Sequence, residues 1–235
     1  MVTHIDDSTE IFKQAVTATM RAISGNDELS VSFGRGKPYL QGNRARVPLP
    51  EVGLTTDQLA ALRGTSDRFA LRVRFHDEAW HRGHRPGAGV AQDVFDCVED
   101  ARVASIGSYL MKGVGQNLNA QLDQHCRNLG YDQIENQSQA PLGEAVGMMI
   151  RERLTGIPLP QSAEKLVSQW REYVNEQIGN DFDQLEECMF DQAEFSRLAR
   201  RIIADLGLSD DWGEENNEGD AEEEEQQSEE MESEA

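Results

Sequence analysis

An acidic run at the C-terminal end limits how much of this chain can form a hydrophobic core. Ser209 to Ala235 contains fourteen acidic residues and no basic ones. It accounts for −14 of the formal net charge of −21, which leaves only −7 for the residues before it. A segment with so much charge and so few apolar residues buries too little surface to offset the entropy of ordering. We therefore expect residues 209–235 to be a disordered acidic tail or linker, and residues 1–208 to be a folded domain.

Hydrophobic residues before the tail recur mostly at helical spacing, as Phe12, Val16 and Met20 do before a stop at Gly25. Thr55 and Gln58 form a capping box that starts a helix ending near Phe75. The other predicted helical segments are 90–129, with a kink or break near Gly107 to Gly115, then Leu142 to Leu154, Ser162 to Ile178 and Asp191 to Leu206. The chain is therefore predicted to be mainly α, with a multi-helix body.

A small β structure is predicted near the N-terminus. Leu29 to Phe33 shows the alternation of a strand, and Arg44 to Leu49 is a second short extended stretch after a turn-rich segment. A small β-hairpin fits this pattern best. Residues 131–141 look like a linker, which leaves open whether the helices form two subdomains or one bundle.

Several classes of function are disfavoured by charge and by motifs. The acidic tail would repel nucleic acid phosphates, no stretch has the length and hydrophobicity of a membrane span, and the first residues do not resemble a signal peptide, so we expect a cytoplasmic protein. The glycine cluster Gly34 to Pro38 lacks the frame of a phosphate-binding loop, so we expect no bound cofactor. The three cysteines are expected to be reduced packing residues: Cys97, Cys126 and Cys188.

The residues that look most capable of chemistry lie between two predicted helices. His76 with Asp77 resembles the paired ligands of metal-dependent phosphohydrolases, and His81 is spaced HxxH from His84. Imidazole and carboxylate ligands can hold a divalent ion that activates water. Such a site needs a further histidine and aspartate on facing helices, and the sequence does not single these out. The default interpretation is that these histidines make ordinary hydrogen bonds. The alternative is a metal site, for which His76, Asp77 and His81 are the candidate ligands.

Glu99 and Arg102 form a second candidate pair. Their i,i+3 spacing places both side chains on one face of a helix. A surface or packing ion pair is the default interpretation, and neither residue is predicted to be catalytic.

Three stretches, taken in order, resemble a known family. They are HIDDSTEIFKQAVTATMRAISGNDELSVSF at residues 4–33, RGTSDRFALRVRFHDEAWH with VFDCVEDARVASIG at 63–81 and 94–107, and PLGEAVGMMIRERLTG at 141–156. These strings resemble the N-terminal region of the CobT-type subunit of aerobic cobaltochelatase, and the family's acidic linker appears after them. The resemblance implies an ATP-dependent enzyme that inserts cobalt into hydrogenobyrinic acid a,c-diamide on the route to vitamin B12.

The resemblance also implies how such a subunit works. Its partners would be an AAA+ ATPase and a large tetrapyrrole-binding subunit, in a hetero-oligomer that uses ATP, Mg²⁺ and Co²⁺. This chain would be a non-catalytic assembly subunit that binds no cofactor itself. The family's C-terminal von Willebrand A domain carries a DxSxS motif that does not occur here, so we interpret the chain as a fragment or a split subunit. Ala104 stands where the family is expected to have a glutamate.

Two other functions compete with this one. The first is a stand-alone metal-dependent hydrolase that uses His76, Asp77 and His81. The second is a scaffold protein that acts through its acidic tail. Neither the docking surface for partners nor the role of His76, His81, Glu99 and Arg102 follows from the sequence.

Overall fold

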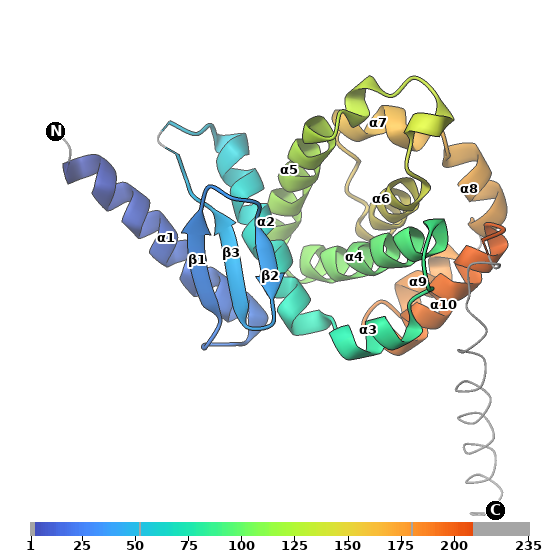
Figure 1. Cartoon of the computed structure of the whole chain (residues 1–235), viewed down its shortest axis with the longest axis horizontal. Helices are drawn as coiled ribbons and strands as arrows, with labels where there is room; N and C mark the ends of the chain where they lie inside the picture. Colours follow the sequence, from blue (N-terminus) through green and yellow to red (C-terminus); the bar gives the residue numbers. More distant parts are fainter. Residues whose placement is uncertain (1–2, 52, 180, 209–235) are drawn as a thin grey trace, which may run out of the picture.

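The computed structural model describes residues 3–51, 53–179 and 181–208. Helices make up most of this part of the chain, and one small sheet lies near its N-terminal end (Figure 1). The expectation of a mainly helical body with a small β structure near the N-terminus is therefore confirmed. The segment that we expect to be disordered, residues 209–235, lies outside the described residues.

The helices begin and end largely where capping chemistry predicts. Thr55 and Gln58 each accept a hydrogen bond from the other's backbone N–H, which completes the predicted capping box. Gly25 and Gly156 follow their helices with φ of 64° and 63°, which a residue without Cβ adopts freely. The helices are α1 (Thr3–Ser24), α2 (Thr56–Phe75), α3 (Glu78–His84), α4 (Val90–Leu110), α5 (Lys112–Asn128), α6 (Leu142–Thr155), α7 (Gln161–Ser168), α8 (Arg171–Ile178), α9 (Phe182–Glu187) and α10 (Gln192–Asp205), with 3₁₀ turns η1 (Tyr131–Gln133) and η2 (Gln137–Gln139).

Four segments differ in detail from the expected helices, and one of them is α9, a short helix that the sequence pattern did not predict. The long segment breaks at Met111, between α4 and α5, within the predicted region. The expected loop after Phe75 contains α3, because the Asp77 carboxylate accepts hydrogen bonds from two backbone N–H groups and caps a short helix. The segment 162–178 forms two helices, since Trp170 lies between α7 and α8 and its indole N–H donates to the Ala140 carbonyl at 2.9 Å.

The sheet corrects one prediction. Strands β1 (Ser30–Gly34) and β3 (Arg44–Pro48) pair in parallel, with Val31 opposite Ala45, so they do not form the expected hairpin. The hairpin partner of β3 is a short third strand, β2 (Tyr39–Gln41), which the sequence pattern did not reveal. A two-residue turn at Gly42 and Asn43 joins them, with φ of 51° at the glycine.

The hydrophobic side chains of the described residues form two clusters that share α4 and α5. One cluster joins α1, the sheet and α2, with Val103 and Ala104 of α4. The other joins α4 to α6 and the later helices, and Val94 and Phe95 of α4 belong to it. Helix α6 lies within the group of helices on the right of Figure 1 and is buried from Ala145 to Arg151. Helices α4 and α5 therefore both carry contacts from one cluster to the other.

Helices α2 and α5 pack tightly against each other at Gly64. A Cβ on this residue would lie 2.2 Å from the Asn117 carbonyl oxygen and 2.6 Å from the Gln121 Cβ. Neither backbone nor Cβ can move aside without shifting the helix. Gly64 therefore fixes the distance between the two helices that flank the pocket described below.

Replacing Gly64 by alanine is expected to lower the free energy of unfolding by about 1–3 kcal/mol, because overpacking outweighs the better helix propensity of alanine. Urea unfolding followed by circular dichroism measures this change. Gly113→Ala in α5 is the matched control, since a Cβ at Gly113 meets no atom within 4 Å. Equal stability of the two variants would contradict the close approach.

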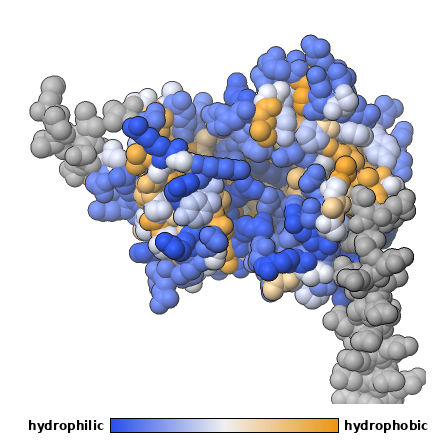
Figure 2. Space-filling view, in the orientation of Figure 1, coloured by the Kyte–Doolittle hydropathy of each residue, from blue (hydrophilic) through white to orange (hydrophobic). Residues whose placement is uncertain are grey.

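Polar residues cover most of the face shown in Figure 2, and hydrophobic residues appear there in small separate areas. Within 3–51, 53–179 and 181–208, none of the helices combines the length and hydrophobicity needed to cross a membrane.

Candidate functional site

The junction of α2, α3, α4 and α10 brings together most of the residues that the sequence singled out. His76 is the C-cap of α2, and Asp77 is the N-cap of α3. The Asp77 carboxylate accepts hydrogen bonds from the N–H groups of Trp80 and Ala79, which hold its pKa below the ordinary value. Asp77 therefore positions α3, and its charge lies at the exposed end of that helix.

The His76 side chain is buried and contacts charged groups through both ring nitrogens. Its Nδ1 lies 2.7 Å from Glu99 Oε1. Its Nε2 lies 2.9 Å from the Arg72 guanidinium and 3.2 Å from the Glu78 carboxylate. Both nitrogens are thus engaged with side chains of the protein itself.

Glu99 and Arg102 form the ion pair that their spacing predicts, and it is deeply buried. Arg102 Nε and Nη2 donate to the two oxygens of Glu99 at 2.7 and 2.8 Å. Arg102 also donates to the carbonyls of Phe75, at the end of α2, and Met189, between α9 and α10. Burial alone would raise the pKa of Glu99, but hydrogen bonds from Arg102 and His76 outweigh it and hold the pKa low. The pair joins three segments that are distant in the sequence.

His81 belongs to a second charged group on the same side of α4. Its Nε2 lies 2.8 Å from Asp96 Oδ1, and Arg85 donates to both oxygens of Asp96. Burial would raise the pKa of Asp96, but its contacts with His81 and Arg85 lower it overall. The His81 ring lies 4.9 Å from both the His76 ring and the Phe95 ring, centre to centre. Its buried Nδ1 has no hydrogen-bond partner among the described residues.

His76, Asp77 and His81 do not converge as metal ligands. Among the described residues, no group of three or more His, Cys, Asp or Glu side chains is arranged to hold a metal ion. A cavity of about 240 Å³ lies beside His81, but its carboxylates, from Glu78, Asp96 and Asp100, already pair with arginines. His76, Asp77 and His81 instead make contacts that hold the junction of α2, α3, α4 and α10 together.

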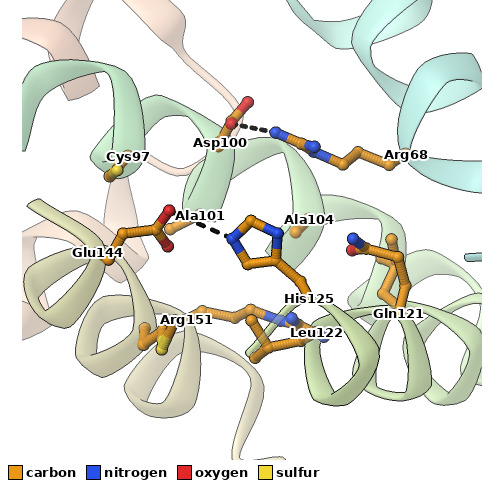
Figure 3. Close-up of a pocket in the computed structure, with 13 residues that line it drawn as sticks. Arg68, Cys97, Asp100, Ala101, Ala104, Gln121, Leu122, His125, Glu144 and Arg151 are labelled. Carbon is orange, nitrogen blue, oxygen red and sulfur yellow. Dashed lines mark hydrogen bonds and ion pairs between the residues drawn. The ribbon is translucent and has the colours of Figure 1, made fainter. Parts of the chain in front are cut away.

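A different pocket lies between α2, α4, α5 and α6 and contains residues that the sequence analysis missed (Figure 3). Among the described residues that line it, Arg68 forms an ion pair with Asp100, and His125 Nε2 lies 3.3 Å from Glu144 Oε1. The Arg151 side chain reaches into it from α6 and makes no hydrogen bond or ion pair with any described residue. The sequence signal that could have revealed it is that Arg151 directly follows the apolar run Val146 to Ile150 and shares a helix face with Gly147 and Met148.

The cysteines are free thiols, as expected. Burial raises the pKa of Cys126 to about 12 and that of Cys188 to about 11, and it also raises the pKa of Cys97. Thiols with such pKa values are protonated at neutral pH and are poor nucleophiles.

The model of the family described as cobalamin biosynthesis protein CobT matches residues 6–235. No solved structure matches the chain.

Proposed function

The chain belongs to the CobT family of cobalamin biosynthesis proteins, and from this premise we propose that it is a non-catalytic assembly subunit of an ATP-dependent aerobic cobaltochelatase. This enzyme, a ligase that forms nitrogen–metal bonds, inserts cobalt into hydrogenobyrinic acid a,c-diamide. The observation that carries the proposal is the family match over nearly the whole chain. The complex would work in the cytoplasm, with Co²⁺ as a substrate and with ATP and Mg²⁺ used by its ATPase.

In this proposal the chemistry belongs to the partners. Inserting a divalent metal requires the corrinoid to deform and to release protons from its ring nitrogens. The large subunit holds the tetrapyrrole while the AAA+ ATPase supplies motion, and this chain connects the two. A connecting subunit has to transmit force without local unfolding. The Arg102 contacts, which join the end of α2 and the segment between α9 and α10 to the middle of α4, are consistent with that requirement.

Reconstitution tests the proposal directly. The tagged chain is mixed with the purified AAA+ ATPase and the large subunit, without nucleotide, with ADP and with ATP, and each mixture is analysed by size-exclusion chromatography. We expect a complex that contains this chain and the ATPase in at least one nucleotide state. The large subunit with the ATPase alone should insert little cobalt, and adding this chain should restore the reaction. No association in any nucleotide state would contradict the proposal.

A deletion separates the assembly role from the scaffold hypothesis. A chain ending at residue 208 keeps every described helix and strand and lacks the acidic segment. An assembly subunit that binds through its helical body retains the complex after this deletion. A scaffold that acts through its acidic tail loses it. Metal analysis of the purified chain tests the hydrolase hypothesis, which requires close to one bound transition metal per chain.

A further inference from the structure

Arg151 is a buried cation without a counterion among the described residues. The residue is 8% exposed, and its Nη2 is buried without a hydrogen-bond partner. Burial lowers the pKa of Arg151 to about 10, so the guanidinium still carries its charge at neutral pH. Keeping a charge in a protein interior without a partner is strongly unfavourable. An anion bound beside it would remove most of that penalty.

The groups around Arg151 define the anion that fits. Figure 3 shows the Arg151 side chain extending from α6 toward α5, beside His125 and Leu122. The cavity measures about 130 Å³, which is enough for a small organic group. Its apolar lining comes from α4, α5 and α6: Ala101, Ala104, Leu118, Leu122 and Met148.

Charge in the pocket favours a monoanion. Arg68 is paired with Asp100, and Glu144 is in contact with His125, whereas Arg151 has no carboxylate partner among the described residues that line the pocket. A phosphate dianion would face the two lining carboxylates. A carboxylate matches the forked donors of a guanidinium, and an aliphatic stem matches the apolar walls.

A larger cavity adjoins the pocket and shares Arg68, Gln121 and His125 with it. This cavity measures about 820 Å³ and lies between the segment Gly34 to Pro38 and helices α2 and α5. Arg35 and Lys37 line it together with one acidic residue, Glu51, among the residues that the structure describes. It offers room for the body of a molecule whose carboxylate reaches Arg151.

We propose that the pocket around Arg151 binds the carboxylate of a small organic acid, with an aliphatic stem against α4 and α5 and the rest of the molecule in the adjoining cavity. The chelatase role is not needed for this site, which follows from the unpaired guanidinium and its surroundings.

Titration of the full chain with sodium propionate, followed by ¹H–¹⁵N NMR at constant ionic strength, tests the site. We expect saturable shifts centred on Arg151, Gln121 and Leu122. Propionamide, which has the same shape but no charge, should bind at least tenfold more weakly. Arg151→Met should weaken propionate binding at least tenfold, whereas Arg153→Met, on the exposed face of the same helix, should leave it unchanged. Equal binding of propionate and propionamide, or by wild type and Arg151→Met, would overturn the proposal.

Folding of the variants is checked in the same experiment. Because Arg151→Met removes an unpaired buried charge, its melting temperature without ligand should be no lower than that of the wild type. Ala104→Glu is a second variant, since Ala104 lines the pocket and a glutamate there places a carboxylate inside it. We expect Ala104→Glu to abolish propionate binding with the fold retained. Undiminished binding in folded Ala104→Glu would overturn the proposed location.

An aliphatic carboxylate can belong to a small organic acid or to an acidic side chain of a protein. A capped tripeptide with a central glutamate distinguishes these two sources. Binding no tighter than that of propionate supports a small acid as the ligand. Binding at least tenfold tighter than propionate, with the same dependence on Arg151, would show that the site takes an acidic side chain of a protein. That result would overturn the small-acid part of the proposal while leaving the role of Arg151.

Discussion

Arg102→Met is expected to lower the free energy of unfolding by about 3–5 kcal/mol, because it leaves Glu99 as a buried, partly unpaired charge. The guanidinium is 1% exposed and donates to both oxygens of Glu99. Its removal also takes a hydrogen bond from the carbonyls of Phe75 and Met189. Equilibrium unfolding in urea, followed by circular dichroism and tryptophan fluorescence, measures the change.

A double-mutant cycle with Glu99→Gln separates the charge effect from the loss of packing. Glu99→Gln/Arg102→Met contains no buried charge at this position, so it should cost clearly less than the sum of the two single variants. Arg153→Met serves as a control, because Arg153 forms an exposed pair with Asp183 and such pairs contribute little. A cost below about 1 kcal/mol for Arg102→Met would show that the contacts with Glu99 and the two carbonyls do not hold the junction together.

Asp67→Asn is expected to change how stability depends on pH. Asp67 is buried in α2, where burial raises its pKa from 3.8 to about 6 despite the hydrogen bond from Asn117 and the nearby Arg63. Between these pKa values the unfolded chain releases the proton while the folded chain keeps it. The neutral form of Asp67 therefore makes its whole contribution to stability below pH 4, and this contribution is lost as the pH rises to about 6.

The size of this effect follows from the difference between the two pKa values. A difference of about two units corresponds to about 3 kcal/mol of stability lost by the wild type between pH 4 and pH 7. The amide that replaces the carboxyl group in Asp67→Asn keeps an oxygen that can accept from Asn117 and has no proton to lose. The stability of Asp67→Asn relative to the wild type should therefore rise by about 3 kcal/mol over that range.

Thermal and urea unfolding of both proteins at several pH values between 4 and 7 measures this difference. Asp183→Asn is the control, because Asp183 is a highly exposed residue whose replacement should leave the pH profile close to that of the wild type. Parallel profiles for Asp67→Asn and the wild type would show that the folded state does not hold the proton on Asp67.

Local chemistry explains why the sequence predicted many helix ends correctly. The capping box at Thr55 and Gln58, and the cap at Asp191, depend on residues within three positions of each other. The ion pair of Glu99 and Arg102 is equally local, since helical geometry brings i and i+3 together. The parallel pairing of β1 with β3 is not local, because β2 and its turn separate the two strands and alternation does not reveal their order.

The sequence by itself therefore determined the helical class, most helix boundaries, the ion pair on α4 and, through its motifs, the family. Tertiary structure alone decided that His76 contacts Glu99, that Asp67 is buried beside Asn117, and that Arg151 lies in a pocket where no described residue partners its charge. The physical reason is that helix periodicity fixes which side chains share a face. Burial and pairing depend on which face of another helix lies opposite, and no local pattern records that choice.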